Sequence, residues 1–271
     1  MSTARSYKKE YDKVLITGHK GFIGSALWKT FLDQGRTEGV DLFGIDIKDG
    51  LNGKIYKEHD ILTADLPEAD LVIHLAGIGG VRESLANPKK YWLNNVKGTR
   101  RILEHYKDSR VLVASSSSQY EPHLNPYAAS KHLIERIPHP HACFLRFHTV
   151  YSDAARTGMF FDKLFAGTLE YVTEHERDFI HLDDMVAALH AIINNDLLAH
   201  TFDIGTGQTI CIKDIISWKE MPVKKDTLGE RQKTQADIDF ITKATDWKPT
   251  ISVRDFLQEN DERLRNLYPV K

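Results

Sequence analysis

The stretch VLITGHKGFIGSAL, residues 14–27, joins a short apolar run to a helical pattern through a turn that contains three glycines. The run at 14–17 is rich in β-branched residues, and Ile23, Leu27 and Phe31 follow the turn at helical spacing. This order predicts a strand, a tight turn and a helix. Such a unit begins many parallel sheets that carry helices on both faces.

The same alternation continues along the chain as far as residue 150. Short and nearly continuous apolar runs, which predict strands, lie at 41–46, 70–77, 110–116 and 142–150. Helical patterns lie between them, at about 88–106 and from about 126. Strands that are apolar throughout are typical of a sheet covered on both faces. We therefore expect an α/β protein with a doubly wound parallel sheet of the Rossmann type.

The pattern loosens after residue 151. An amphipathic helix is still clear at 183–194, whereas the later stretch KEMPVKKDTLGERQKTQAD is polar and irregular. We predict a Rossmann domain over 12–150, to which 178–206 returns. A small C-terminal lobe would be built from 151–177 and 207–271.

The composition argues against several classes of protein. With 271 residues, 41% hydrophobic and 27% charged, the chain can bury a large core, and its formal net charge of -2 gives no basic field for nucleic acid or an anionic membrane. No charged and apolar leader opens the sequence, and no apolar run approaches the roughly 20 residues of a membrane helix. The two cysteines cannot form a disulfide framework, and the histidines and carboxylates show no metal-binding spacing. We expect a cytoplasmic globular protein without a metal site.

The glycines of the first turn, Gly18, Gly21 and Gly24, suit a phosphate ligand. They allow a tight turn, a close approach of the backbone to a pyrophosphate and close packing of helix on sheet, while the helix N-terminus favours negative charge. Asp46 ends the second strand, where a carboxylate can accept hydrogen bonds from adenosine ribose hydroxyls and repels a 2′-phosphate. This favours NAD over NADP. Lys20 keeps NADP open, because an ammonium in the turn could meet a 2′-phosphate.

The stretch SSSSQYEPHLNPYAASK, residues 115–131, places a hydroxyl, a phenol and an ammonium after consecutive strands. Tyr127 and Lys131 are separated by one helical turn and share a helix face. Free tyrosine, with a pKa of about 10, is a poor base at neutral pH, but a nearby cation favours the phenolate. Ser116 can donate a hydrogen bond to a carbonyl oxygen whose charge changes during hydride transfer. Such pairs also occur on solvated helices; their position in a nucleotide-binding sheet favours a catalytic role.

An ordered series of motifs covers nearly the whole chain. It runs from VLITGHKGFIGSAL through HDI, VIHLAG, NNVKGT, SSSSQY, PYAASK and LRFHTVY to RDFIHLDD. On these motifs the chain resembles the extended short-chain dehydrogenases/reductases of the nucleotide-sugar epimerase/dehydratase group. The resemblance implies an enzyme that binds NAD in the Rossmann domain and a nucleotide sugar in the small lobe. It also implies a homodimer formed through helices around 88–106 and 127–137.

The resemblance assigns roles to individual residues. Ser116, Tyr127 and Lys131 match the catalytic residues of the group. Asp60 and Ile61 would flank the adenine, and Asn95 would help to fix the strand near the nicotinamide. The residues Leu75, Ala76 and Gly77 would line the diphosphate and ribose. The residues expected to bind the cofactor are Gly18, Gly21, Phe22, Ile23, Gly24, Asp46, Asp60, Ile61, Leu75, Ala76, Gly77, Asn95, Tyr127 and Lys131.

The reaction implied by the resemblance is 4-epimerisation. Dehydratases of the group carry an acidic pair directly after the catalytic hydroxyl, whereas this chain has Ser117 and Ser118 there. Other segments look most like the 4-epimerases that act on UDP-glucuronate, in which the tyrosine takes a proton while hydride passes to NAD and a 4-keto sugar turns over. An NADPH-dependent keto-sugar reductase or epimerase-reductase stays open because of Lys20. A non-catalytic NAD(P)-binding protein stays open because of altered substrate motifs.

Four residues are candidates for substrate binding: Arg82, Ser117, Thr149 and Arg231. Arg82 could meet a phosphate or a carboxylate, and it could equally be a surface arginine at the start of a helix. Thr149 stands where the group has asparagine, and Thr227 stands where it has an arginine for the diphosphate, which Lys224, Lys225 or Arg231 could replace. We expect Arg177 and Asp178 to be structural, tying the small lobe to the sheet.

Overall fold

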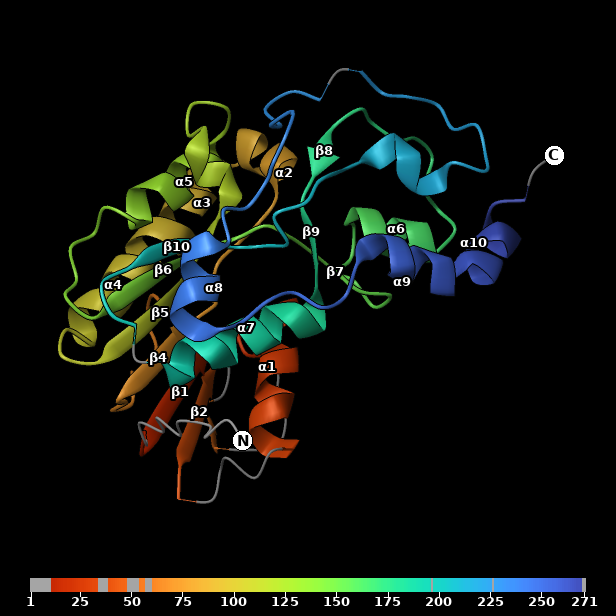
Figure 1. Ribbon diagram of the computed structural model, residues 1–271. Coiled ribbons are helices and arrows are strands. Elements are labelled where there is room, and N and C mark those ends of the chain that lie inside the picture. The colour runs from red at the N-terminus through yellow and green to blue at the C-terminus, as the bar shows by residue number, and fades with distance from the viewer. Residues whose placement is uncertain are drawn as a thin grey trace, which may run out of the picture.

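A seven-stranded parallel sheet forms the centre of the protein (Figure 1). The computed structural model describes residues 11–33, 39–47, 60–195, 197–225 and 227–269, and the backbone of 54–56. The strands follow the order β10-β6-β5-β4-β1-β2-β3, and every neighbouring pair is parallel. Their bounds are β1 Lys13–Thr17, β2 Asp41–Ile45, β3 Lys54–Tyr56, β4 Leu71–His74, β5 Arg110–Ser116, β6 Ala142–Phe147 and β10 Thr201–Ile204.

Helices cover both faces of this sheet, as expected from its apolar strands. Helices α1 (Phe22–Asp33) and α7 (Leu182–Asn194) pack on one face, whereas α4 (Gly98–His105) and α5 (Pro126–Ile134) pack on the other (Figure 1). The alternation along β1 divides its side chains between two core clusters. Val14 and Ile16 pack with the helices of the first face. Leu15 packs with those of the second. The doubly wound α/β fold is therefore confirmed.

Two predicted elements are interrupted. The helical pattern at 88–106 divides into α3 (Pro88–Tyr91), a π-helical turn η1 (Trp92–Lys97) and α4. The predicted strand at 142–150 divides into β6 and β7 (Thr149–Tyr151), because the chain changes its hydrogen-bonding partners there. The His148 N–H still donates to Ile204 of the main sheet, whereas the Thr149 N–H donates to Asp178. Strand β3 is too short to leave a sequence pattern.

A smaller unit stands at the end of the sheet. Strand β7 pairs with β9 (Phe179–His181), and β8 (Glu176–Arg177) pairs with β11 (Ile210–Cys211). An aromatic core joins these strands to α6 (Phe160–Phe165), α9 (Val253–Glu259), α10 (Asp261–Leu267) and the 3-10 turn η3 (Ile212–Ile216). Figure 1 shows α6, α9 and α10 together, well away from α1 and α4.

The boundary between the two units is crossed by the chain several times. Ile241 of α8 (Asp239–Thr245) and Trp247 fall within the range 207–271 predicted for the small lobe, yet they pack in the core cluster of α1 and α7. They do so because α8 lies against β10 and α7. Helix α8 and Trp247 therefore pack with the main sheet, although they lie within the range 207–271 assigned to the small lobe.

Buried carboxylates fasten the crossing segments. Asp178 accepts hydrogen bonds from the Thr206 N–H and hydroxyl, and from the N–H groups of Gly207 and Ala236, over 2.7–3.0 Å. Asp184 accepts from the Thr250 and Ile251 N–H groups in the same way. These carboxylates are satisfied by backbone donors, so their function is structural.

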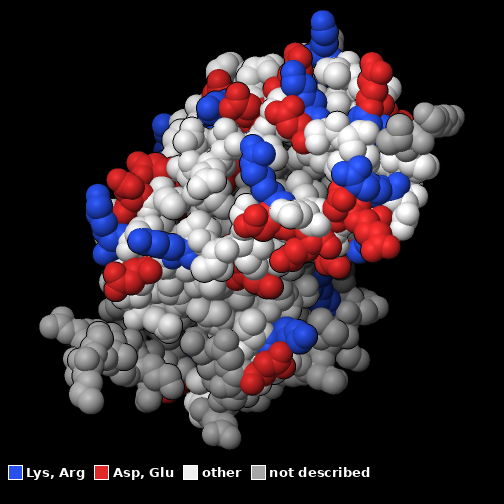
Figure 2. Space-filling view, turned by 45° about the vertical axis from the view of Figure 1, so that its right-hand side comes forward, with Lys and Arg blue, Asp and Glu red and all other residues white. Residues whose placement is uncertain are grey.

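The surface carries charges of both signs. Figure 2 shows Lys and Arg side chains interspersed with Asp and Glu side chains over the described part of one face, without a wide field of either sign. Within the ranges that the structure describes, no helix is long and apolar enough to cross a membrane.

Candidate active site

The glycine turn after β1 is held by close backbone contacts. Gly18 has a φ of +73°, and its N–H donates to the Ile45 carbonyl over 2.7 Å. A Cβ on Gly18 would lie 2.7 Å from the Ala76 nitrogen, and a Cβ on Gly24 only 2.1 Å from the Gly18 oxygen. The turn therefore excludes side chains where β1, α1 and the loop after β4 meet. Phe22 and Ile23 begin α1 directly behind it.

Asp46 lies beside this turn at the end of β2. Its Oδ2 accepts a 3.0 Å hydrogen bond from the Lys20 N–H, so the carboxylate fixes the backbone of the turn. His19 is fully buried and packs on Trp28 with 4.8 Å between ring centroids. Its ring occupies the space beside Gly44, where a Cβ would lie 2.8 Å away. Lys20 and Asp46, the two residues with opposite implications for NADP, are thus adjacent.

The loop after β4 contains Leu75, Ala76 and Gly77. The Leu75 N–H donates to the Thr17 carbonyl, and the Ala76 N–H donates to the Thr17 hydroxyl. Below it, the His74 ring bridges the hydroxyls of Thr17 and Thr99 at 2.7 and 3.0 Å. Burial lowers the pKa of His74 to about 3, with a smaller contribution from the Lys131 charge. A neutral imidazole can accept at one nitrogen and donate at the other, so this ring is a structural bridge.

Asn95 lies in the π-helical turn and joins the loop after β4 to α5. Its Oδ1 accepts from the Ile78 N–H and its Nδ2 donates to the Ile78 carbonyl and the Ser130 hydroxyl, at 2.9–3.0 Å. Ser130 in turn donates to the Tyr127 carbonyl over 2.7 Å. The π-helical turn places this buried amide where it can align the loop with the helix that carries Tyr127.

Asp60 and Ile61 lie in a separate part of the site. Asp60 accepts a hydrogen bond from the Leu62 N–H over 2.9 Å. The Ile61 side chain is buried in the core cluster beside α4, and its carbonyl accepts from Arg101 over 2.6 Å. The structure therefore fixes the backbone at the position predicted for the adenine, with the isoleucine side chain directed into the core.

Ser116, Tyr127 and Lys131 meet at the carboxyl end of β5. Ser116 ends the strand, and its hydroxyl is near enough to the Tyr127 phenol to act on the pKa of that phenol. The Lys131 ammonium donates to the Ala114 carbonyl over 2.6 Å. It lies 3.8 Å from the position of a Cβ on Gly77, so it adjoins the loop after β4. The three residues predicted to be catalytic are thus gathered beside the loop predicted to hold the cofactor.

Burial dominates the electrostatics of this group. It raises the pKa of Tyr127, while the Ser116 hydroxyl and the positive charge of Arg156 act in the opposite direction. It lowers the pKa of Lys131 to about 8, against the effect of the Glu135 charge. Two groups whose pKa values are shifted by burial and by specific neighbours are typical of a reactive site.

Asn125 fixes the start of α5. Its Oδ1 accepts from the Ala128 N–H over 2.7 Å, and Pro126 occupies the first helical position. Its Nδ2 donates over 2.8 Å to the carbonyl of Gly229 in the small lobe. The residues 227–231, which we call the strap, thus lie against the end of the helix that carries Tyr127.

The strap also reaches the segment after β5. Arg231 Nε lies 2.6 Å from Glu121 Oε2, and its Nη1 donates to the Ser117 carbonyl over 2.9 Å. Ser117 begins the 3-10 turn η2 (Ser117–Tyr120) and is buried. Two of the residues predicted to bind substrate, Ser117 and Arg231, are therefore in direct contact. Thr149 is half-buried in β7, where its N–H donates a hydrogen bond to the Asp178 carbonyl.

Arg82 lies at the start of α2 (Val81–Ala86) and contacts the strap. Its Nη2 and Nε lie 3.0 and 3.2 Å from Glu230 Oε1, and its Nη1 donates to the Tyr171 hydroxyl over 2.8 Å. Glu230 also lies 3.5 Å from Arg177 Nη2. Arg82 therefore bridges α2 and the small lobe, with its guanidinium bound to a carboxylate.

Arg156 is a cation of the site that the sequence patterns did not mark. It follows β7, and its Nη2 donates to the Gly79 carbonyl over 3.0 Å. Its charge acts on the phenols of both Tyr127 and Tyr91. The ring centroids of these tyrosines are 6.1 Å apart. Arg156 thus adds a positive charge beside the proposed base.

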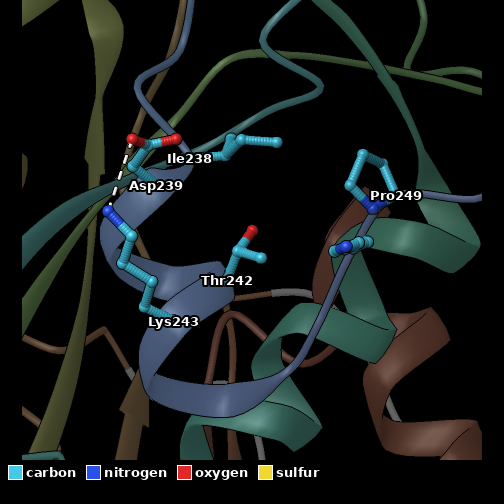
Figure 3. Close-up of a pocket in the computed structure, with 6 residues that line it drawn as sticks. Ile238, Asp239, Thr242, Lys243 and Pro249 are labelled. Atoms are coloured by element: carbon cyan, nitrogen blue, oxygen red, sulfur yellow. Dashed lines mark ion pairs between the residues drawn. The ribbon is translucent and has the colours of Figure 1, made fainter.

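A surface hollow beside α8 is a different place (Figure 3). It is lined by Ile238, Asp239, Thr242, Lys243, Lys248 and Pro249. Asp239 and Lys243 pair across one helical turn, with 3.6 Å between their charged atoms. None of these residues belongs to the group around Tyr127. Among the residues that the structure describes, no His, Cys, Asp or Glu side chains gather closely enough to hold a metal ion.

Comparison with known protein families places the chain. A model of the NAD dependent epimerase/dehydratase family matches residues 14–205, a range that includes the glycine turn and the three residues predicted to be catalytic. The chain belongs to the NAD-dependent epimerase/dehydratase family. It is thus a member of an enzyme family, and the resemblance noted in its motifs is confirmed.

Relatives in this family match almost end to end. An uncharacterized UDP-glucose epimerase, YtcB, of Bacillus subtilis is 27% identical and covers 94% of this chain and 99% of its own length. A UDP-glucuronate 4-epimerase of Thermodesulfobacterium geofontis is also 27% identical, covering 90% and 93%.

Solved structures of the family agree with the fold. MoeE5 in complex with UDP-glucose and NAD has a TM-score of 0.81 at 27% identity, covering 94% of this chain and 99% of its own. The UDP-glucuronic acid 4-epimerase from Bacillus cereus, in complex with UDP-glucuronic acid and NAD, has a TM-score of 0.79 at 28% identity and covers 94% and 100%.

Several residues around the candidate site were not predicted from the sequence. Asn125 had a usable signal, because an asparagine directly before a proline is typical of a helix N-terminus. Arg156 and Glu230 had none, since their roles arise from contacts between segments far apart in the chain.

Proposed function

We propose that the protein is an NAD-dependent nucleotide-sugar 4-epimerase acting on a UDP-hexuronate such as UDP-glucuronate. The observation that carries the proposal is the group at the end of β5, where the Tyr127 phenol meets the Ser116 hydroxyl beside a buried Lys131. A phenol, a hydroxyl donor and an ammonium around one point suit the oxidation and reduction of a secondary alcohol. Membership of the family supports this reaction class.

The glycine turn fits a dinucleotide. Backbone of the chain itself fills the positions where Gly18 and Gly24 would carry a Cβ, so these glycines hold the turn tightly against the start of α1. The N–H groups at a helix N-terminus suit a pyrophosphate. Asp46 lies beside the turn, where its carboxylate could accept hydrogen bonds from the ribose hydroxyls of a dinucleotide. NAD bound there would supply the acceptor for the hydride that leaves C4 of the sugar. The structures of MoeE5 and of the Bacillus cereus enzyme with NAD support this assignment.

The residues of the chain supply the proton chemistry. Tyr127, as phenolate, takes the proton of the sugar 4-hydroxyl, and Ser116 donates a hydrogen bond to that oxygen as it becomes a carbonyl. The positive charges of Lys131 and Arg156 favour the phenolate. After the 4-keto sugar has turned over, the hydride would return from the reduced cofactor to the other face of C4, and Tyr127 returns the proton to the C4 oxygen.

The serines after Ser116 favour epimerisation over dehydration. Expulsion of water from the sugar needs an acid and a base, and the hydroxyls of Ser117 and Ser118 supply neither at neutral pH. Arg156 favours an anionic sugar, because a guanidinium beside the base could bind a C5 carboxylate. The curated and solved UDP-glucuronate 4-epimerases support this substrate class.

The test is direct. Purified protein with UDP-glucuronate and NAD should give a mixture with its 4-epimer, detected by anion-exchange chromatography and proton NMR, and Tyr127→Phe should remove the activity. The proposal is wrong if no UDP-, GDP- or dTDP-sugar is interconverted, or if Tyr127→Phe retains full activity. No conversion together with tight NAD binding would instead indicate a non-catalytic NAD-binding protein.

An NADPH-dependent keto-sugar reductase or epimerase-reductase is the second candidate. The observation in its favour is Lys20, whose backbone is held by Asp46 at the edge of the ribose position. A reductase would oxidise NADPH stoichiometrically with product. An epimerase should turn over without an added hydride donor.

We also propose that the protein is a cytoplasmic homodimer. Three apolar side chains are exposed on α2, the π-helical turn and α5, namely Leu85, Trp92 and Leu133, at 39%, 47% and 38%. Helix α5 contacts both α2 and the π-helical turn, and exposed apolar side chains on neighbouring elements suit association with a second copy. The chain has only two cysteines, too few for a disulfide framework, which suits a reducing compartment. Light scattering of the wild type and of Trp92→Glu tests the dimer, which the variant should weaken.

A further inference from the structure

A buried ion pair lies one helical turn below Lys131. Glu135 caps α5, and its side chain is 7% exposed. Arg146 of β6 reaches it with both arms of the guanidinium: Nη2 lies 2.8 Å from Oε2, and Nε lies 3.1 Å from both carboxylate oxygens. The Ser115 hydroxyl donates to Oε1 over 2.5 Å. This two-armed geometry is the strong form of an arginine–carboxylate contact.

Glu135 shares a helix face with the proposed catalytic residues. Tyr127, Lys131 and Glu135 follow one another at intervals of one turn along α5. Ser115 precedes Ser116 on β5, and the Ala114 carbonyl of the same strand accepts from Lys131. The contacts of Glu135 and Lys131 thus attach the same helix to two consecutive residues of the same strand, Ser115 and Ala114. A shift of Glu135 would carry the ammonium with it.

Among the charged groups of the described residues that act on Lys131, the anion is Glu135. On α5 it has Tyr127 above and Glu135 below, and from β4 it is faced by His74, which is neutral at ordinary pH. Arg156 acts on Tyr127 from the loop after β7. The residue that offsets the cost of burying the Lys131 charge is Glu135.

We propose that Glu135 is a positioning residue that keeps Lys131 protonated and in place, and that Arg146 sets how much of the Glu135 charge acts on Lys131. The inference rests on the role proposed for Lys131 in the reaction. In wild-type protein the guanidinium partly neutralises the carboxylate. Removing either partner should therefore move the protonation of Lys131, and the two directions should be opposite.

The sign of each change follows from the charges. In Glu135→Gln the anion is lost and the Arg146 cation stays, so the ammonium is disfavoured and the Lys131 pKa falls. In Arg146→Gln the anion loses its partner, so the ammonium is favoured and the Lys131 pKa rises. The double variant removes both charges and should return close to the wild type. A purely structural role would change all three in the same direction or not at all.

The experiment measures Lys131 itself. The rate of acetylation of its amine is followed against pH by mass spectrometry of the peptide that contains it, in full-length protein with NAD absent and present. We expect the apparent pKa to move by roughly half a unit or more in each single variant, downward for Glu135→Gln and upward for Arg146→Gln. Glu104→Gln is the control, since Glu104 is an exposed member of a pair with Arg100 on α4.

The result does not depend on turnover, so it is separable from the failure of the proposed epimerisation. Equal pKa values in the wild type and Glu135→Gln, or shifts of the same sign in the two single variants, would overturn the inference. If Arg146→Gln does not fold, the comparison of Glu135→Gln with Glu104→Gln decides alone. Where epimerisation is measurable, the alkaline limb of kcat should move with the labelled pKa while KM stays within about twofold.

Discussion

Arg82 Nη2 of α2 lies 3.0 Å from Glu230 Oε1 of the strap, across the boundary between the main sheet and the small lobe. Arg82 was predicted to meet a phosphate or carboxylate of the substrate, and in the structure an internal carboxylate already occupies it. A diphosphate that used this guanidinium would have to displace Glu230.

Glu230→Gln should therefore strengthen the binding of UDP. A partly exposed ion pair of this kind is worth up to about 1 kcal/mol, so the gain is roughly two- to fivefold in Kd. Isothermal titration with UDP measures it. Glu83→Gln is the matched control, because Glu83 lies next to Arg82 on α2 and forms its ion pair with Lys90. Weaker binding in Glu230→Gln would show that Glu230 assists the ligand and does not compete with it.

Lys131→Met should lower the catalytic rate and raise the free energy of unfolding. Loss of the ammonium should lower kcat at least about a hundredfold. Burial lowers the Lys131 pKa from 10.5 to about 8, so replacement should raise the free energy of unfolding near pH 7 by roughly 3 kcal/mol.

The pH dependence of that gain has a definite sign. Below pH 8 both the native and the unfolded state hold the proton, and the full cost of the buried charge is present. Between about pH 8 and 10.5 the native state has released its proton and the unfolded state has not, so the wild type gains stability relative to Lys131→Met as the pH rises. Denaturant titrations at pH 7 and 10 check this. A constant difference would contradict it.

Gly24→Ala should abolish cofactor binding and destabilise the fold. The new Cβ would lie 2.1 Å from the Gly18 oxygen, and relief requires that the turn move away from α1. We expect a loss of about 1–3 kcal/mol in unfolding free energy. Gly21→Ala is the matched comparison, since its Cβ would stand at 3.1 Å from the same oxygen. Thermal denaturation and NAD titration should both rank Gly24→Ala as the more severe change.

Arg156→Met should separate charged from neutral sugars. The loss of a charged hydrogen bond costs about 1.5–3 kcal/mol, so kcat/KM for UDP-glucuronate should fall roughly ten- to hundredfold. Because the Arg156 charge also acts to lower the Tyr127 pKa, the acid limb should move to higher pH for every substrate. The decisive quantity is the ratio of kcat/KM for UDP-glucuronate to that for UDP-glucose. An unchanged ratio would remove Arg156 from substrate selection.

The parts of the molecule that follow from local pattern were predictable. Strand β1, the glycine turn and α1 were recognised because periodicity and glycine spacing record both backbone geometry and burial. The proximity of Ser116, Tyr127 and Lys131 was predictable for a similar reason, since a strand end and a helix face bring them together.

The missing parts are contacts between distant segments. The pairing of Arg82 with Glu230, the position of Arg156 beside Gly79 and the support of Glu135 by Arg146 depend on where loops and neighbouring strands meet. No spacing in the sequence encodes these distances. The break between β6 and β7 was missed because both halves are apolar, and only the change of hydrogen-bonding partners separates them.

The hydrogen bonds of the Asp178 carboxylate determine how early during synthesis the joint between the main sheet and the small unit can form. Its four donors come from residues 206, 207 and 236, so the last of them leaves the ribosome well after Asp178 itself. Until then a buried charge lacks part of its solvation. The nascent main sheet can assemble early, but the joint with the small unit closes only when residue 236 arrives. A chain that stops before residue 236 should therefore be a better target for proteolysis than its length alone suggests.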